Sequence, residues 1–253
     1  MREAGIDVSG LRRDPEVPTT LALVHTFPNG DRDFSFYRKP GADILLRADE
    51  LESDVLRGSR IFHFGSLSLT DEPCRSATAA AIDAAKAAGA LLSFDPNLRA
   101  PLWPSPEAAR EQIAWGLARC DICKISDNEL LFMTGEADFD HGAAILRSRY
   151  PNIRLLCVTA GADGSYAFYE NQRVFEPACA LGGVIETTGA GDTFCACMLN
   201  CVLEHGLEEL TAEQLSGMLR FANTAAYLVT TKKGAIRSMP ERSEVEALLH
   251  CNM

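Results

Sequence analysis

The sequence predicts an α/β fold in which a mainly parallel sheet is covered by helices on both faces. The chain has 253 residues, of which 47% are hydrophobic and 23% charged, so it is long and apolar enough to bury a sizeable core. Short, continuous apolar runs alternate along it with longer segments that have helical spacing. Because strands buried on both faces appear as continuous apolar runs, this alternation indicates parallel strands joined by helices.

The predicted elements begin with a hairpin, because Asn29 and Gly30 lie between two alternating runs and this dipeptide is the strongest short-range hairpin signal. Strands are expected at residues 20–24, 34–37, 61–64, 91–94, 122–125, 155–159, 165–169 and 173–175. Helices are expected at residues 49–56, 72–88, 106–118, 128–134, 139–150, 191–205, 212–229 and 241–249.

Several boundaries have a physical signal of their own. Gly89 follows the Ala-rich segment 72–88 and ends it, since glycine readily adopts the left-handed conformation after a helix. Gly161 and Gly164 predict a tight turn before a small antiparallel meander. Residues 1–4 have a helical composition but are too few for a stable helix, because nucleation costs more than one turn returns.

Composition and charge exclude several classes of function. Thirty-five acidic residues against 24 basic ones give a net charge of −11, which repels nucleic-acid phosphates and anionic membrane surfaces. The first residues lack the apolar core of a signal peptide, and no run of about 18 apolar residues occurs. We therefore expect a cytoplasmic protein that binds neither nucleic acid nor membranes.

The nine cysteines are expected to be free, buried thiols, because their number is odd and they lie in apolar segments. Cys120 and Cys123 have the spacing of redox and zinc sites, but neither a second such pair nor paired histidines follow. Cys195, Cys197 and Cys201 share one predicted helix without a histidine at ligand spacing. We interpret all five as packing residues.

The densest cluster of special residues is the segment 186–192, Glu-Thr-Thr-Gly-Ala-Gly-Asp, which opens a predicted helix. A Gly-Ala-Gly turn at a helix N-terminus exposes backbone N–H groups beside the positive end of the helix dipole, and both favour a bound phosphate. Asp192 follows this turn and has two interpretations. It is either a carboxylate that stabilises the helix dipole or a general base beside a bound phosphoryl group.

Three other phosphate-binding devices are excluded. The sequence contains neither the Walker motif of P-loop NTPases nor the catalytic and metal-binding motifs of protein kinases. A dinucleotide-binding turn is excluded as well, because Phe194 stands where the third glycine belongs and no later strand carries the ribose-binding acid.

Taken together, the motifs resemble those of the ribokinase-like (PfkB) carbohydrate kinases. The segment 186–192 is similar to the family's signature D-T-x-G-A-G-D, and residues 159–164 are similar to its T-x-G-x-x-G turn. Residues 221–226, Phe-Ala-Asn-Thr-Ala-Ala, resemble the helix beside the adenine. The phrases at 94–99, Phe-Asp-Pro-Asn-Leu-Arg, and at 36–43, which begins Phe-Tyr-Arg, resemble those of the fructokinase-like branch.

This resemblance implies one ribokinase-like domain over residues 1–253, a three-layer α/β/α structure with a mainly parallel sheet and a small β-hairpin lid at about 19–40. Family members begin with a further strand and a Gly-Gly loop that contacts the sugar, so we expect a truncated or shortened N-terminal part. The exposed edge of the hairpin, residues 20–37, favours pairing with a second copy and hence a homodimer.

The resemblance also implies ATP-dependent phosphorylation of a sugar hydroxyl, with fructose as the expected substrate. Asp192 would be the general base, and the amides of Gly189, Ala190 and Gly191 would stabilise the transferring phosphoryl group. Arg99 would reach either the γ-phosphate, as a catalytic residue, or the sugar, and Asn97 would bind the sugar hydroxyls. Implied on the nucleotide side are Lys124, Thr159, Gly161, Gly164, Gly191 and Asn223, and on the metal side, for Mg²⁺ and K⁺, Glu129, Glu186 and Thr188. The plainer interpretation of the loop at 96–99 is a turn with a surface arginine.

Two departures from the family pattern bear on the metal side. Ser126 stands where the family's N-x-x-E has Asn, which predicts a looser network around Mg²⁺. Glu186 replaces the first Asp of the signature, so its carboxylate lies about one C–C bond further out, and activation by K⁺ is left open.

Two alternatives to a fructokinase follow from the same residues. One is a non-catalytic homologue that binds nucleotide but cannot hold a sugar. The other is a kinase for another substrate, such as 2-keto-3-deoxygluconate or a nucleoside.

Overall fold

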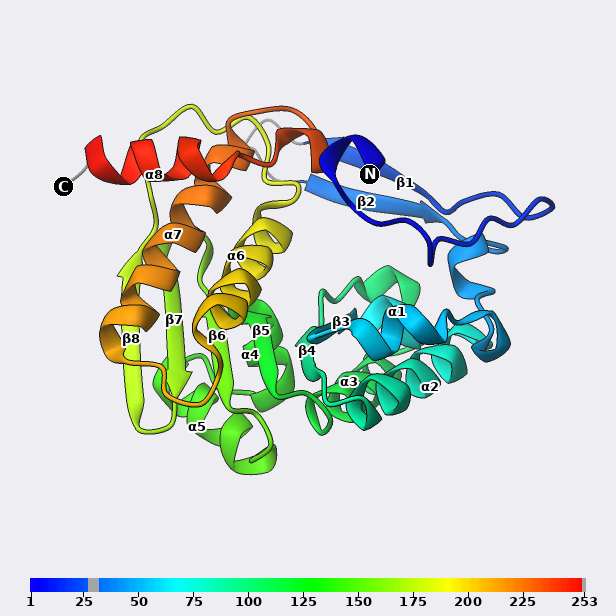
Figure 1. Ribbon diagram of the computed structural model, residues 1–253. Helices are drawn as coiled ribbons and strands as arrows, with labels where there is room; N and C mark the ends of the chain where they lie inside the picture. The colour runs from blue at the N-terminus through cyan, green and yellow to red at the C-terminus, as the bar shows by residue number, and fades with distance from the viewer. Residues whose placement is uncertain (27–31, 252–253) are drawn as a thin grey trace. The chain divides into compact units, whose positions relative to one another are not determined.

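The computed structural model describes residues 1–26 and 32–251, and the chain divides into two compact units, Met1–Asp121 and Ile122–Met253. The expected hairpin turn at 28–31 lies outside the described residues. Figure 1 follows the chain from the N-terminal unit, drawn in blue to green, to the C-terminal unit, drawn in green to red. Each unit is described by itself.

The first unit contains the predicted hairpin. Strands β1 (Leu21–Thr26) and β2 (Arg32–Tyr37) pair antiparallel, with Leu21 opposite Tyr37. Before them, a single 3-10 turn over Arg2–Ala4 is closed by Gly5, which has a φ of 74°. This short turn agrees with the expectation that the first residues are too few for an α-helix.

Arg38 anchors the end of the hairpin within the first unit. Its side chain is 7% exposed, and its guanidinium donates to the hydroxyl of Thr70 at 2.7 Å and to the carbonyl of Leu67 at 2.8 Å. It also forms an ion pair with Asp43. Buried charges need such partners, so this part of the fructokinase-like phrase has a structural role.

Parallel strands and their helices complete the first unit. Strands β3 (Ile61–Gly65) and β4 (Leu91–Asp95) pair in parallel, with Phe64 opposite Phe94 and their ring centroids 4.8 Å apart. The helices are α1 (Ser53–Gly58), α2 (Cys74–Ala87) and α3 (Pro106–Leu117), and short 3-10 turns cover Ala42–Ile44, Ala48–Glu50, Ser66–Leu69 and Ala100–Leu102.

The prediction of one helix over residues 49–56 is wrong. The structure has a 3-10 turn at Ala48–Glu50 and then α1, which starts only at Ser53. The Glu50 carboxylate accepts the amide of Arg47 at 2.9 Å, and Leu51 then takes an extended conformation with a ψ of 134°. The hydrogen bond between the Glu50 side chain and the Arg47 backbone closes this short turn, so that the turn does not continue into a longer helix.

The second unit contains strands in the order β5 (Ile122–Ser126), β6 (Leu155–Thr159), β7 (Gly164–Tyr169) and β8 (Gln172–Pro177). The pair β5 and β6 is parallel, whereas β7 pairs antiparallel with both β6 and β8. Residues Leu155–Val158 are all 0% exposed. Because successive side chains of a strand point to opposite faces, both faces of β6 are covered, as the sequence predicted.

Five helices of the second unit follow the predicted positions. They are α4 (Asp127–Thr134), α5 (Phe139–Arg149), α6 (Ala190–His205), α7 (Ala212–Thr230) and α8 (Arg242–Cys251). Helices α6 and α7 pack side by side, and α7 also packs on β7 and β8. The α/β class and the mostly parallel strands are thus confirmed. Among the described residues, no helix is long and apolar enough to cross a membrane.

Candidate functional site

The predicted anion-binding turn lies at the start of α6. Gly189 precedes the helix with a φ of 83°, a conformation that favours glycine. The amide of Ala190 donates to the carbonyl of Thr187 at 3.2 Å, so this amide, one of the three predicted for phosphate binding, is used by the turn itself. The amides of Gly191 and Asp192 belong to the first helical turn, where no earlier carbonyl of the helix is available, whereas the amide of Thr193 donates to the carbonyl of Gly189 at 2.8 Å.

Lys124 brings a cation to this turn. It lies on β5 and is 6% exposed, and a Cβ placed on Gly191 would be 3.2 Å from its Nζ. An ammonium group beside the positive end of a helix dipole reinforces the attraction for an anion. The absence of a side chain at Gly191 keeps the space in front of the ammonium open.

Asp192 is in the first turn of α6 and is exposed. Among the described residues, its carboxylate takes part in no hydrogen bond or ion pair. The two other acidic candidates differ. The carboxylate of Glu129 accepts the amide of Ser126 at 2.9 Å, and that of Glu186 accepts the amide of Gly234 at 2.8 Å. Asp192 is therefore the candidate carboxylate that the fold leaves available for chemistry.

A cavity of about 640 Å³ adjoins the turn, within the usual size range of small-molecule sites. Four segments of the second unit form it, namely the turn after β6, the segment that follows β8, the start of α6 and the last turns of α7. The lining residues are Thr159, Gly161, Ala162, Gly164, Ala178, Cys179, Ala180, Gly182, Val184, Thr187, Ala190, Gly191, Phe194, Asn223, Ala226, Tyr227 and Thr230.

The structure thus brings together most residues predicted for the nucleotide side. Thr159, Gly161, Gly164, Gly191 and Asn223 all line this one cavity. The sixth residue of that set is the lysine whose ammonium lies against Gly191, as described above.

Asn223 is buried, at 9% exposed, and its side chain is occupied by the protein. Its Oδ1 accepts the hydroxyl of Ser165 at 2.8 Å, and its Nδ2 donates to the carbonyls of Glu176 and Pro177, both at 3.0 Å. These bonds tie α7 to β7 and to the end of β8. Asn223 therefore shapes the cavity wall through its position in the fold.

The metal-side candidates Glu129 and Glu186 do not belong to a cluster of acidic, histidine or cysteine side chains in the described part of the chain. Among residues 1–26 and 32–251, no three His, Cys, Asp or Glu side chains form a group that could hold a metal ion. Glu129 is 7% exposed and caps α4 together with the hydroxyl of Ser126. Thr188 is half-buried. A divalent cation at this site would therefore take further ligands from outside these side chains, such as water or the phosphate oxygens of a bound substrate.

The sugar-side candidates belong to the first unit, in the loop after β4. Asp95, at the end of that strand, is 4% exposed, and its carboxylate accepts the amide of Asn97 at 3.1 Å. Asn97 has a φ of 45°, which asparagine tolerates better than most residues. The guanidinium of Arg99 donates to the carbonyl of Leu98 at 3.2 Å.

Five of the cysteines are buried as expected, whereas Cys179, Cys197 and Cys201 are half-buried and Cys251 is exposed, which corrects the expectation that all nine are buried. Cys120 and Cys123 are both 0% exposed, and all nine cysteines are free. Burial raises the pKa of the Cys197 thiol to about 11, and burial likewise raises the pKa of Cys157 and Cys179. Thiols with raised pKa values are poor nucleophiles near neutral pH.

Sequence reasoning missed part of the cavity wall. Ala178, Cys179, Ala180, Gly182 and Val184 come from the segment after β8, which carries no recognisable motif. Their only signal was the glycine-rich composition ahead of the 186–192 segment.

On α7 a periodic signal was available. Asn223, Ala226, Tyr227 and Thr230 recur at helical spacing, as residues on one face of a helix do. The hydroxyl of Tyr227 donates to the carbonyl of Gly182 at 2.7 Å and holds the glycine-rich segment against the helix.

Comparisons with known proteins agree with this geometry. Residues 1–242 match the model of the pfkB family of carbohydrate kinases. The probable fructokinase-2 of Arabidopsis thaliana is 43% identical over 253 residues, covering 98% of this chain and 75% of its own length. Fructokinase-2 of Solanum lycopersicum is 40% identical over 253 residues, again with 98% and 75% coverage.

Solved structures give the same result. A fructokinase double mutant from Vibrio cholerae O395, bound to fructose, ADP and a potassium ion, has a TM-score of 0.88 at 30% identity, covering 98% of this chain and 78% of its own. Fructokinase with bound ATP from Xylella fastidiosa has a TM-score of 0.88 at 31% identity, covering 99% and 79%.

Aminoimidazole riboside kinase from Salmonella enterica has a TM-score of 0.84 at 27% identity, covering 98% of this chain and 79% of its own. The chain therefore belongs to the pfkB family of carbohydrate kinases, in its fructokinase-like branch, and its class is that of the ATP-dependent sugar kinases.

Proposed function

We propose that this protein transfers the γ-phosphoryl group of ATP to a hydroxyl of fructose, with Asp192 as the general base. The observation that carries the proposal is a single arrangement in the second unit. A cavity of about 640 Å³ adjoins the Gly191 turn, a buried lysine lies against that turn, and the exposed carboxylate of Asp192 follows it.

In this proposal the nucleotide occupies the cavity. Its base and ribose lie among the mainly apolar walls, which α7 supplies through Ala226 and Tyr227. Its phosphates reach the first turn of α6, where backbone amides and the helix dipole favour negative charge. The ammonium of Lys124 adds a full positive charge next to Gly191. Phosphoryl transfer depends mostly on such positioning and electrostatic stabilisation.

Asp192 accepts the proton of the sugar hydroxyl while the hydroxyl oxygen attacks the γ-phosphorus. The new bond joins the sugar oxygen to phosphorus, the bond from phosphorus to the β,γ-bridging oxygen breaks, and ADP leaves with that oxygen. A positioned general base contributes roughly 10²–10⁴ in rate. The carboxylate is suited to this step because, among the described residues, no hydrogen bond or ion pair occupies it.

Mg²⁺ enters this proposal with the nucleotide. Glu129 and its partner Ser126 lie at the start of α4, directly after β5, and we propose that Glu129 orients water around the metal–phosphate complex. For K⁺, Glu186 and Thr188 are the proposed residues, and the hydrogen bond of Glu186 to Gly234 fixes its carboxylate beside the turn. Asn97 and Arg99 remain the proposed sugar-side residues.

A second substrate class is favoured by one observation. The Salmonella enterica kinase, whose structure was solved with aminoimidazole riboside, superposes with a TM-score of 0.84, close to the values of the fructokinases. A ribonucleoside is therefore the main competitor of fructose. A protein that binds nucleotide without catalysis is the remaining alternative, because the nucleotide cavity is formed within the second unit alone.

The test is an ADP-release assay with ATP and a panel of fructose, 2-keto-3-deoxygluconate and aminoimidazole riboside. We expect the highest kcat/KM with fructose. Calorimetric titrations with ATP and with fructose, each alone, distinguish the remaining possibilities. Binding of ATP without binding or turnover of any sugar would support the non-catalytic alternative, and turnover confined to the riboside would replace fructose as the substrate.

We also propose that the β1–β2 hairpin mediates a homodimer. Leu21, Leu23 and Tyr37 are 57%, 49% and 64% exposed on it, and an exposed strand edge readily pairs with another. Sedimentation equilibrium of the wild type and of Leu23→Lys tests this. We expect a dimer that the lysine converts to a monomer, and a monomeric wild type would contradict the proposal.

A further inference from the structure

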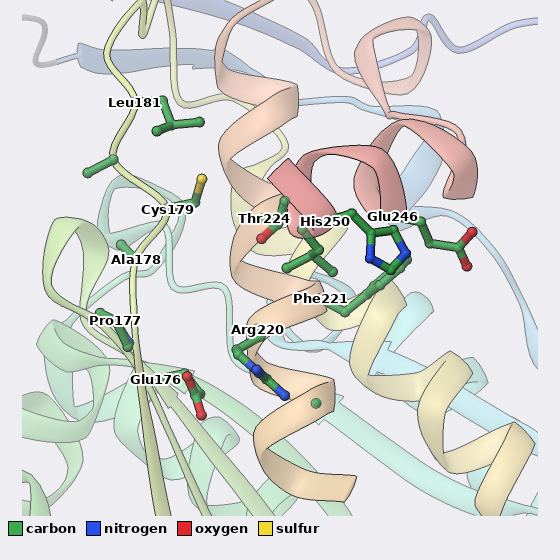
Figure 2. Close-up of a pocket in the computed structure, with 13 residues that line it drawn as sticks. Glu176, Pro177, Ala178, Cys179, Leu181, Arg220, Phe221, Thr224, Glu246 and His250 are labelled. Atoms are coloured by element: carbon green, nitrogen blue, oxygen red, sulfur yellow. The ribbon is translucent and has the colours of Figure 1, made fainter. Parts of the chain in front are cut away.

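We propose that the second unit has another binding site, for a small amphipathic anion, and that its occupancy is coupled to nucleotide binding. The site is a cavity of about 570 Å³ between the segment after β8, the middle of α7 and the C-terminal helix α8 (Figure 2). Residues of the Gly191 turn and of the turn after β6 do not line it. It is therefore separate from the place where the phosphates of the nucleotide are proposed to bind.

The walls of this cavity are mainly apolar. Pro177 lines it from the end of β8, Leu181 from the segment after that strand, Phe221 from α7 and Leu249 from α8. Figure 2 shows Phe221 beneath the end of α8, beside His250. An apolar cavity of this size is suited to the hydrocarbon or aromatic part of a small molecule, since such sites are mostly apolar with a few polar groups.

The charged side chains at the cavity indicate which polar group the ligand carries besides its apolar part. Both carboxylates are already engaged, because Glu176 accepts a hydrogen bond from the hydroxyl of Ser216, and Glu246 forms an ion pair with Arg242 at 3.0 Å. Arg242 in turn lies 5.5 Å from the ring centre of Phe221. Glu246 is therefore paired with an arginine that Glu204 shares, whereas Glu176 keeps its charge and accepts one hydrogen bond.

The two basic residues differ from the acidic ones. Within the described part of the chain, neither Arg220 nor His250 takes part in a hydrogen bond or an ion pair, and both line the cavity. Figure 2 shows Arg220 at one end of the cavity and His250 near the other. An anion is the complementary group for a guanidinium, which binds carboxylates and phosphates through several N–H donors. The ligand is thus an aromatic or aliphatic molecule with one carboxylate or phosphate.

Coupling to the nucleotide follows from a shared wall. Ala178, Cys179 and Ala180 line both this cavity and the proposed nucleotide cavity, so a ligand that orders or displaces the segment on one side changes the wall on the other. This part of the inference rests on the proposed function. Coupling between two sites is reciprocal and typically amounts to about 5–150-fold in affinity.

The binding step is tested with the fluorescent anion 1-anilinonaphthalene-8-sulfonate, titrated into the wild-type protein with saturating ADP. We expect octanoate to displace this probe and octanol, its uncharged counterpart, to displace it at least about tenfold less well, since a hydrogen bond to a charged group contributes on that scale. Equal displacement by octanol, or no probe binding to the ADP-saturated protein, would overturn the proposal.

A matched pair of variants assigns the site. Arg220→Gln removes the cationic group of the cavity, whereas Arg237→Gln removes an exposed arginine that does not line it. We expect Arg220→Gln to weaken octanoate binding about tenfold or more and Arg237→Gln to leave it unchanged. Equal binding by both variants would rule out Arg220 as the anion-binding group.

The coupling is tested by the Kd of ADP with and without saturating octanoate, and by the Kd of octanoate with and without ADP. We expect both to change by the same factor, at least about fivefold. Unchanged values in both titrations would overturn the coupling. Failure of ADP to bind at all would instead contradict the proposed function, and the probe titration without ADP would still decide whether the second site exists.

Discussion

Two glycine turns line the same cavity for different physical reasons. In the turn after β6, Gly164 has a φ of 127°, and a Cβ placed on it would lie 2.2 Å from the carbonyl oxygen of Glu176. In the first turn of α6, a Cβ on Gly191 would meet only the flexible end of Lys124, at 3.2 Å. The backbone of the protein itself requires glycine at 164, whereas at 191 glycine keeps space free in front of a cation.

This difference teaches how to interpret glycines in a binding motif. A glycine whose missing side chain would overlap the protein backbone supports the fold, and its replacement is expected to reduce stability. A glycine that faces open space next to a charged group supports ligand binding, and its replacement is expected to reduce activity. Variants at the two turns and at the contacts around them test this distinction.

The largest effect is expected for Gly164→Ala. The left-handed conformation costs about 1–3 kcal/mol for a residue with a side chain, and the overlap with Glu176 costs about 1–3 kcal/mol more. We expect Tm to fall by at least about 5 °C, since each kcal/mol shifts Tm by about 2–4 °C at this chain length. Gly161→Ala is the control, because Gly161 has a φ of 54° but nothing within 4 Å of its Cβ position. Equal loss in both variants would contradict the steric part of the argument.

Asn223→Leu tests the hydrogen bonds that hold α7 to β7 and to the end of β8, next to the turn that contains Gly164. The substitution removes the amide that bonds to Ser165, Glu176 and Pro177, and each buried polar group left without a partner costs about 1–3 kcal/mol. We expect unfolding free energy to fall by about 2–4 kcal/mol in chemical denaturation. A stable variant that has lost only ATP affinity would show instead that Asn223 serves the nucleotide directly.

Gly191→Val tests the glycine turn at the start of α6. The branched side chain would enter the space in front of the Lys124 ammonium, while valine is better tolerated than glycine within a helix. We expect kcat/KM for ATP to fall about tenfold or more, a loss of about 1.4 kcal/mol in transition-state stabilisation, with Tm unchanged or raised. Unchanged kinetics in a folded variant would remove the anion-binding assignment of this turn.

The smallest effect is expected at the opposite end of α6. There the hydrogen bond from Arg242 holds the pKa of Glu204 below its usual value of 4.5. A lowered pKa in the folded state stabilises the fold above the usual value, and this stabilisation is lost as the pH falls through the lowered pKa. The Glu204 side chain is 42% exposed, so we expect Glu204→Gln to cost under about 1 kcal/mol at pH 7.

Urea denaturation of wild type and Glu204→Gln at several pH values measures this effect. The difference in unfolding free energy should narrow as the pH falls below the usual value of 4.5. A difference that is independent of pH would show that packing, rather than the charge, is responsible.

The sequence predicted most elements because their signals are local. The continuous apolar run Leu155–Val158, the glycine after each of α2 and α4, and the glycine-rich start of α6 each carry their own signal. The break in the helix expected at 49–56 was missed, because it depends on Glu50 bonding back to Arg47. That choice between two local conformations is not visible in composition.

The roles of individual site residues were harder to predict than their positions. Asn223 and Glu129 lie in the predicted segments, but their polar atoms bind other parts of the chain. Such partners are set by tertiary packing, which a single sequence does not display. The apolar wall at 178–180 was missed for the same reason, since small residues without a motif acquire a role only from what packs around them.

The proposed role of Asp192 as the general base of a sugar kinase is tested by Asp192→Asn. The amide keeps the shape of the side chain and cannot accept the proton. We predict that kcat with fructose falls at least about 100-fold, while the Kd of ADP, measured by calorimetry, stays within about threefold of the wild type. A variant that retains more than about a tenth of the wild-type kcat would contradict the claim, because a general base contributes at least about 10².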